Sequence, residues 1–299
     1  MIGLYQVDGK WPNLALMHLA GWFREHGERV ARIGAIEQEM CAVVYASKIF
    51  SDSDASGVSD RAIRGGTGWA DWRSLPPLPD EIEHCYPAYD LWDEKRAIGF
   101  LTRGCIRRCP FCFVPEKEGI IRHHAHLSEW WRGQDHICLL DANITGHPDV
   151  LGYLDELAQS GARVDFSQGV DVRLMTEEIA RALAKIRRYK QLHIAWDNPK
   201  EERPVLAGIR ILGAAMPKGS LMAYVLVGYN SSEEEDIHRV SILRDLGIDP
   251  FVMPYNKRDE YQRRFARWVN HKAIFKSVSW REYATQQTLS HSGAQSFLL

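Results

Sequence analysis

The sequence lacks several features that would place it in a broad class of proteins. Its 37 Lys and Arg residues nearly balance its 39 Asp and Glu residues, so it has no overall basic field of the kind a nucleic-acid coat protein needs. No segment approaches the roughly 20 consecutive apolar residues of a membrane span. The first residues, MIGLYQVDGKWPN, lack the basic start and long apolar run of a signal peptide. We therefore expect a cytoplasmic protein with no membrane partner.

Cysteine is also scarce, and half of it is concentrated in one place. The chain has six cysteines, of which Cys105, Cys109 and Cys112 lie within the segment GCIRRCPFCFVPEKEG. In a reducing compartment, clustered thiols favour a metal centre or catalysis over disulfides. Cys41 and Cys138 lie inside the apolar runs CAVVYA and HICLLD, so we expect them in the core.

The first part of the chain indicates alternating strands and a helix. Residues 2–7 and 41–47 are short apolar runs typical of strands, and residues 13–27 between them carry apolar side chains at helical spacing. Asn13 is a suitable N-cap for this helix, and Gly27 is a suitable end. Such alternation predicts a parallel sheet in an α/β fold.

Six further strand and helix units follow residues 51–80, a stretch rich in Ser, Asp, Gly and Pro that we expect to be a loop. Their spacing of roughly 30 residues is typical of the repeating units of a (β/α) barrel. Because about eight units close a full barrel, six predict an open, partial (β/α)6 barrel of the TIM type over residues 93–256. Residues 257–299 have no strand signal, and we expect a helical C-terminal extension there. The predicted strands are residues 97–102, 136–141, 162–167, 192–197, 221–228 and 250–255, and the predicted helices are residues 147–161, 176–189, 202–215 and 232–247.

The cysteine triad follows the first of these strands, at the end of a barrel strand where such enzymes place their active sites. Three thiolates without an obvious fourth leave two metal centres open. One is zinc, completed by His123, His124 or His126. The other is an iron–sulfur cluster with one iron open to a further ligand. Structural zinc sites usually pair two C-x2-C motifs, and this chain has one, which favours the cluster.

The motif resembles that of the radical S-adenosylmethionine superfamily. Cys105, Cys109, Phe111 and Cys112 match its C-x3-C-x2-C spacing with an aromatic residue before the third cysteine. The resemblance implies that the cysteines bind a [4Fe–4S] cluster, that S-adenosylmethionine chelates the open iron, and that Phe111 packs beside the adenine. It also implies an enzyme that takes an electron from a reductant such as flavodoxin or ferredoxin. That electron would cleave S-adenosylmethionine to a 5′-deoxyadenosyl radical, which abstracts hydrogen from an unidentified substrate.

Residues 104–122 resemble the branch of that superfamily that includes methylthiotransferases and cobalamin-dependent enzymes. This branch carries an N-terminal Rossmann-like domain, which the resemblance places at residues 1–92. Residues 1–100 lack the D-x-H-x-x-G string through which such domains often coordinate cobalt, so we favour a degenerate domain without cobalamin. A cobalamin-dependent radical methyltransferase is the alternative.

Polar residues and a glycine near the ends of the predicted barrel strands are further candidates for cofactor binding. Carboxylates and hydroxyls there suit a ribose, a guanidinium suits a carboxylate, and a glycine lets the backbone approach an adenine closely. The same residue types also occur in helix-entry turns, surface loops and cores, so both roles stay open. The candidates are Asp141, Asn143, Ser167, Gln168, Asp171, Arg173, Asp197, Gly228 and Met253.

The segment 257–283 is both basic and aromatic. That composition suits a contact with nucleic acid, and a non-catalytic metal protein that binds nucleic acid is our third hypothesis. However, Tyr261, Phe265 and Trp268 recur at helical spacing, and such a stripe usually packs on a core. We therefore favour a C-terminal helix with Trp268 buried and its arginines in solvent.

Overall fold

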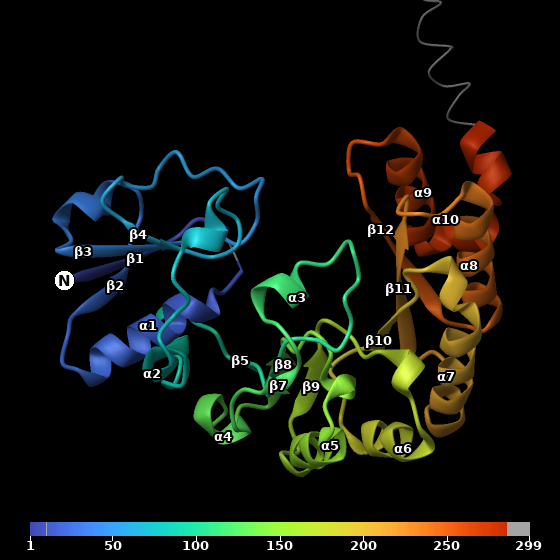
Figure 1. The fold of residues 1–299 in the computed structure, drawn as a ribbon, viewed down its shortest axis with the longest axis horizontal. Coiled ribbons are helices and arrows are strands. Elements are labelled where there is room, and N and C mark those ends of the chain that lie inside the picture. Colours follow the sequence, from blue (N-terminus) through green and yellow to red (C-terminus); the bar gives the residue numbers. More distant parts are fainter. Residues whose placement is uncertain (10, 286–299) are drawn as a thin grey trace, which may run out of the picture.

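The computed structural model describes residues 1–9 and 11–285, so the end of the predicted extension lies outside the described residues. It is a mixed α/β fold with parallel sheets, as the alternation of apolar runs predicts. Figure 1 shows the N-terminal sheet at one end of the longest axis and the C-terminal helices at the other. In the part of the chain that is described, no helix is long and apolar enough to cross a membrane.

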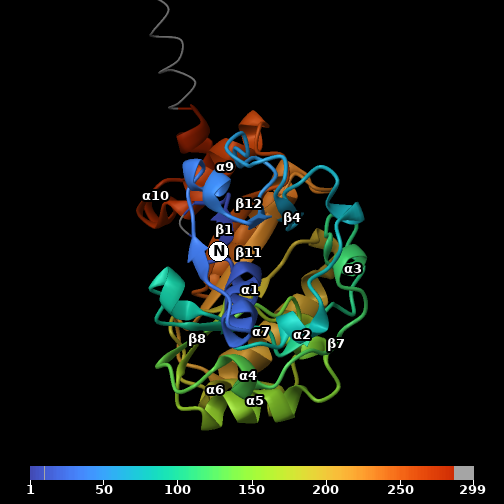
Figure 2. The same cartoon turned by 90° about the vertical axis from the view of Figure 1, so that its left-hand side faces the viewer.

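Four parallel strands form the N-terminal sheet. The elements of this part are β1 (Ile2–Gln6), α1 (Leu14–Glu25), β2 (Val30–Arg32), β3 (Val43–Ser47), β4 (Ile63–Gly65) and α2 (Asp80–Glu83). The strand order is β2-β1-β3-β4, and Figure 2 views this sheet from its own end of the molecule, with the C-terminal strands behind it. Helix α1 begins after Asn13, whose side chain accepts a hydrogen bond from the Leu16 N–H at 3.1 Å. It ends before Gly27, which has a φ of +78°, so both predicted ends of this helix are confirmed.

Two predictions for the N-terminal part are wrong in detail. The loop predicted for residues 51–80 contains β4, which pairs in parallel with β3. Strand β2 lies in a segment without a predicted strand and pairs with β1. Each of these strands has only three residues, none of them buried. They form because a neighbouring strand offers backbone hydrogen bonds, and this does not require an apolar run in their own sequence.

The six strands predicted for the C-terminal part are all present, although the first is shorter than predicted. Residues 97–102 contain a strand only to Gly99, because Thr102 belongs to an antiparallel hairpin that frames the cysteine segment. The strands are β5 (Ala97–Gly99), β6 (Thr102–Arg103), β7 (Arg122–His123), β8 (His136–Leu139), β9 (Arg163–Phe166), β10 (Leu192–Ala195), β11 (Leu221–Val227) and β12 (Asp249–Pro254). The hairpin pairs β6 with β7.

The longer strands pair in two parallel groups, β5-β8-β9 and β10-β11-β12. A parallel bridge between Val170 and Ile194 joins the two groups. The four predicted helices are confirmed and lie along the outer side of the strands (Figure 1). The confirmed helices are α5 (Val150–Gln159), α6 (Glu177–Lys185), α7 (Glu202–Ala215) and α8 (Glu233–Asp245). Two short helices that were not predicted precede them, α3 (Val114–Lys117) and α4 (Leu127–Trp130).

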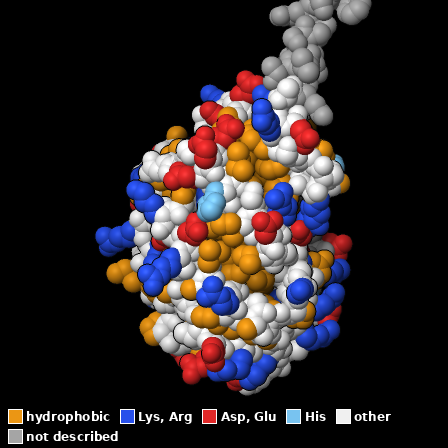
Figure 3. Space-filling model, turned by 90° about the vertical axis from the view of Figure 1, so that its right-hand side faces the viewer, with side chains coloured by type: hydrophobic (Ala, Val, Ile, Leu, Met, Phe, Trp, Pro, Cys, Tyr) orange, Lys and Arg blue, Asp and Glu red, His pale blue; other side chains and the backbone are white. Residues whose placement is uncertain are grey.

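The C-terminal segment is helical and packs on the core. It forms α9 (Glu260–Asn270) and α10 (Lys272–Ser277). Phe265 and Trp268 are buried, which confirms the packing predicted for the aromatic stripe. Arg263 and Arg267 on the same helix are exposed as predicted, but Arg264 is half-buried and donates to the carbonyl oxygen of Ala284 at 2.6 Å. Figure 3 looks onto the side of the C-terminal helices, where Lys and Arg side chains are interspersed with Asp and Glu. The buried aromatic rings are not available to stack on bases. Of the two features that suit a nucleic-acid contact, this segment therefore keeps only its basic side chains.

A buried histidine connects α1 to the segment after α2. His18 is 8% exposed, and its Nδ1 lies 2.6 Å from the carbonyl oxygen of Cys85. Burial lowers the pKa of His18 from 6.5 to about 4. Between these two pH values the unfolded chain binds a proton that the folded protein excludes, so acid lowers the free energy of unfolding.

We predict that His18 alone causes a loss of about 3 kcal/mol in stability as the pH falls from 6.5 to 4. His18→Gln, which keeps a donor for the carbonyl of Cys85, should remove most of this loss. Chemical denaturation at pH 7.5 and pH 4.5 measures it, with the exposed His26→Gln as the matched control. Equal pH dependence in the His18 and His26 variants would contradict the prediction.

Candidate functional site

The cysteine segment begins and ends at fixed points on the β6–β7 hairpin. Gly104 has a φ of +86°, and a Cβ there would lie 2.5 Å from the carbonyl oxygen of Ile120, so only glycine fits. The Gly104 N–H donates to the Glu118 carboxylate at 3.0 Å. The Cys105 N–H donates to the carbonyl oxygen of Gly119 at 3.1 Å. These hydrogen bonds hold the two ends of the loop together in the metal-free protein.

The three cysteines are partly buried on this loop. Two N–H groups are directed at the Cys105 sulfur, the Arg107 backbone at 3.3 Å and the Asn143 side chain at 3.4 Å. Burial raises the pKa of Cys109 and of Cys112, and repulsion from the neighbouring cysteines acts in the same direction. A metal that binds here therefore displaces protons from thiols.

Three thiols on one loop are a suitable donor set for an iron–sulfur cluster, and N–H groups directed at cysteine sulfur are a known means of tuning such clusters. Within residues 1–9 and 11–285, no three His, Cys, Asp or Glu side chains already lie in an arrangement that would hold a metal ion. The chemistry of the donors fits the cluster, and its binding would bring the three sulfurs together.

Asp171 joins the cysteine loop to the strand ends beside it. Its carboxylate accepts from Arg107 Nε at 2.9 Å and from Arg173 Nε and Nη2 at 2.7 and 2.9 Å. Arg173 also pairs with Glu201. Burial acts to raise the pKa of Asp171, but the hydrogen bonds from Arg173 and Arg107 hold it below its usual range. The ionised carboxylate between two guanidinium groups is a strong, charge-assisted contact.

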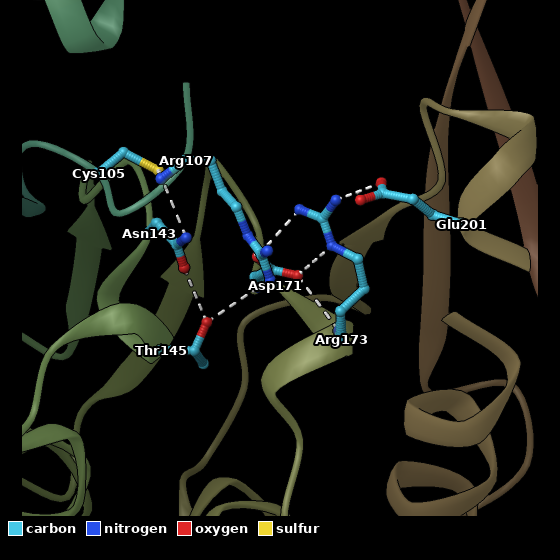
Figure 4. Close-up of polar contacts among 7 residues, drawn as sticks. All are labelled: Cys105, Arg107, Asn143, Thr145, Asp171, Arg173 and Glu201. Carbon is cyan, nitrogen blue, oxygen red and sulfur yellow. Dashed lines mark hydrogen bonds and ion pairs between the residues drawn. The ribbon is translucent and has the colours of Figure 1, made fainter. Parts of the chain in front are cut away.

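The backbone of Asp171 is also linked to Cys105 by a chain of hydrogen bonds (Figure 4). The Asp171 N–H donates to Thr145 Oγ1 at 3.0 Å, and this hydroxyl donates to Asn143 Oδ1 at 2.9 Å. Asn143 in turn donates to the Cys105 sulfur. The segments after β8 and β9 thus both contact the cysteine loop.

A cavity of about 350 Å³ lies beside the cysteine loop. The loop forms one wall, and the segments after β9, β10 and β11 form the others. The rings of Phe111 and Tyr229, which both line the cavity, are in edge-to-face contact with centroids 5.2 Å apart. Burial raises the pKa of Asp197 in its wall, and the Leu226 N–H donates to this carboxylate at 3.1 Å. The lining residues are Arg107, Arg108, Cys109, Pro110, Phe111, Arg173, Ala195, Asp197, Asn198, Lys200, Glu201, Tyr229 and Asn230.

Comparison with known proteins finds an enzyme that this chain resembles over part of its length. The chain is 24% identical over 212 residues to the tRNA-2-methylthio-N(6)-dimethylallyladenosine synthase of Sulfurihydrogenibium sp. (strain YO3AOP1). The match covers 60% of this chain and 48% of the relative, so the chain spans about half the length of that protein. No protein-family model matches the chain. The relative is named as a synthase, and the similarity supports an enzyme with an unspecified reaction.

The structure brings some of the sequence-predicted residues together and separates others. Phe111, Arg173 and Asp197 line the cavity with Cys109. Asp171 does not line it but binds Arg107 and Arg173, which do, and Asn143 contacts Cys105, which lies outside the lining. The roles proposed for all these residues stay predictions.

The remaining candidates lie outside the cavity lining, namely Asp141, Ser167, Gln168, Gly228 and Met253. Both oxygens of Asp141 accept hydrogen bonds from the backbone between β5 and β6. Ser167 Oγ donates to the carbonyl oxygen of Leu139 at 2.8 Å. The space beside Gly228 that a Cβ would fill is occupied by the Gln262 side chain.

The sequence interpretation missed several residues of the cavity. Arg107 and Arg108 lie inside the cysteine motif, where the spacing of the thiols is the stronger signal. Ala195 lies within a predicted strand. Five others follow predicted strands by one to four positions, namely Asn198, Lys200, Glu201, Tyr229 and Asn230. Considering every residue up to four positions beyond each strand end would have found these five. The histidines considered for zinc have other contacts, since His123 Nδ1 lies 2.8 Å from the Tyr153 hydroxyl.

We predict that Asp171→Asn lowers the free energy of unfolding by about 2 kcal/mol, because it removes charge-assisted bonds to two arginines. The cysteine loop should also loosen, so that Cys105, Cys109 and Cys112 react faster with a thiol reagent in the metal-free protein. Asp135→Asn, which breaks an exposed pair with Arg163, is the control. Unchanged thiol reactivity in the Asp171 variant would contradict the role given to this carboxylate.

Proposed function

We propose that the protein is a radical S-adenosylmethionine enzyme whose Cys105, Cys109 and Cys112 hold a [4Fe–4S] cluster. The observation that carries the proposal is that the cysteine loop forms a wall of the 350 Å³ cavity, with Cys109 in the lining. When bound, the cluster supplies the electron that cleaves S-adenosylmethionine to methionine and a 5′-deoxyadenosyl radical. A flavodoxin or ferredoxin in a cytoplasmic compartment is the proposed source of that electron.

The cavity residues suit the parts of S-adenosylmethionine. The rings of Phe111 and Tyr229 would pack against the adenine. Asp197, held by the Leu226 N–H, would accept hydrogen bonds from ribose hydroxyls. Arg173 carries a guanidinium held in place by Asp171, and it would attract the methionyl carboxylate. Each of these side chains is positioned by protein contacts, so it loses little further conformational freedom when the ligand binds.

The architecture that accompanies this proposal has three parts. They are a degenerate Rossmann-like domain over residues 1–92, a partial six-stranded barrel over residues 93–256 and a helical extension over residues 257–299. The strand order β5-β8-β9 followed by β10-β11-β12, with the bridge between the groups, supports the partial barrel. The cavity lies where the segments after the strands meet, which is the active end of barrel enzymes.

We further propose that the substrate is RNA, because the relative acts on tRNA. Arg108 and Lys200 line the cavity, are exposed, and have no ion-pair partner among the described residues. Such cations attract phosphates. A cobalamin-dependent methyltransferase is less favoured, since the N-terminal part has no cobalt-binding histidine motif.

The first test is anaerobic reconstitution with iron and sulfide, followed by reduction with dithionite in the presence of S-adenosylmethionine. We predict about four irons per chain and formation of 5′-deoxyadenosine. Replacing Cys105, Cys109 and Cys112 with Ala should abolish both, and Cys85→Ala should change neither. One zinc per chain with no iron uptake would contradict the proposal, and a corrinoid spectrum after growth with cobalamin would favour the methyltransferase.

The second test is a salt series of RNA binding. Replacing Arg108 and Lys200 with Ala should weaken binding and lower the slope of log K against log salt by about 2. Replacing the exposed Arg263 and Arg267 of α9 with Ala is the matched control and should leave the slope unchanged. Dependence on the α9 pair instead would locate the RNA on the C-terminal extension, and absence of RNA binding would remove RNA as the substrate.

A further inference from the structure

Arg239 of α8 is a fully buried cation that binds the ends of two strands. Its side chain has 0% exposure. Nη1 donates to the carbonyl oxygens of Trp196 at 2.7 Å and Asp197 at 3.2 Å, which follow β10. Nη2 donates to the carbonyl oxygen of Leu226 at 3.0 Å, near the end of β11. One guanidinium therefore holds two neighbouring strands at the edge where the cavity lies.

Leu226, whose carbonyl oxygen binds Arg239, also positions Asp197, a residue that lines the cavity. The Leu226 N–H donates to the Asp197 carboxylate at 3.1 Å, and the Leu226 carbonyl accepts from Arg239. A shift of Arg239 thus moves both the backbone of Asp197 and the donor that orients its side chain. Tyr229 and Asn230, which follow β11, line the cavity next to this point.

Arg239 is itself held by the C-terminal helix. Its charge is balanced by Asp236, also 0% exposed, to which Nη2 donates. The other oxygen of Asp236 accepts from the hydroxyl of Tyr261 on α9 at 2.9 Å. The next residue of α9, Gln262, fills the space beside Gly228, immediately after β11. Two adjacent residues of α9 therefore reach the end of β11 by separate contacts.

We propose that Tyr261, Asp236 and Arg239 are positioning residues, through which helix α9 sets the strand ends that carry Asp197, Tyr229 and Asn230. The inference rests on the proposed function for its ligand, S-adenosylmethionine. Its physical basis does not depend on that function. A buried guanidinium must have its charge balanced, and Asp236 balances the charge of Arg239. The position of Asp236 is fixed in part by the hydroxyl of Tyr261.

The mild variant Tyr261→Phe tests this, because it removes one hydroxyl and keeps the ring in the core. Hydrogen–deuterium exchange of the cluster-free protein should become faster in residues 196–200 and 226–231 and stay unchanged in residues 136–143. Lys272→Ala is the matched control, since it breaks a contact of the same C-terminal segment with Asp249 of β12 and leaves Asp236 and Tyr261 in place. It should leave exchange in both strand-end segments as in the wild type.

The second readout is the affinity of the reconstituted enzyme for S-adenosylmethionine. Tyr261→Phe should weaken it about two- to tenfold, as expected for the loss of one supporting hydrogen bond, and Lys272→Ala should not weaken it at matched stability. Exchange and affinity that are both unchanged in Tyr261→Phe would overturn the inference. If the wild-type enzyme does not bind S-adenosylmethionine, the proposed function fails, but the exchange experiment still decides whether α9 positions the strand ends.

Discussion

The candidate site depends most on the carboxylate of Asp171, which is shared between Arg107 and Arg173. Arg107 belongs to the cysteine loop, Asp171 follows β9, and Arg173 extends to Glu201 after β10. One side chain thus ties three separate segments into one cavity wall. Removing it would leave two arginines without their common partner, which is more costly than the loss of an isolated surface pair. The backbone of the cysteine loop is therefore held in place in the metal-free protein, and binding of a cluster would need to move only the thiol side chains.

The other side of the cysteine loop is held by the N-terminal part of the chain. Arg103, which is mostly buried, pairs with Glu118 at 3.0 Å and with Glu83 of α2 at 3.3 Å. Arg73 pairs with Glu116 of α3, but both groups are exposed, so this pair contributes less. The N-terminal part of the chain accordingly supports the loop through the pair of Glu83 in α2 with Arg103.

The sequence predicts the elements of the fold better than the contacts of the site. Strand β8, for example, is an apolar run because both of its faces are buried, and the three cysteines stand out by their spacing. The pairing of Arg107 with Asp171 was not predictable, because 64 positions separate these residues and no local pattern links them. The same holds for Gln262, which fills the space beside Gly228. Asp141 was a reasonable ligand candidate from its place after β8, but the backbone between β5 and β6 uses both of its oxygens.

The central claim is that a cluster on the cysteine loop has an iron that binds S-adenosylmethionine in the adjoining cavity. Electron paramagnetic resonance of the reduced, reconstituted protein tests this directly, because coordination changes the signal of the cluster itself. We predict that adding S-adenosylmethionine shifts the signal of the wild type, and that Asp197→Ala needs a higher concentration for the same shift. A cluster signal that is identical with and without saturating S-adenosylmethionine would contradict the account.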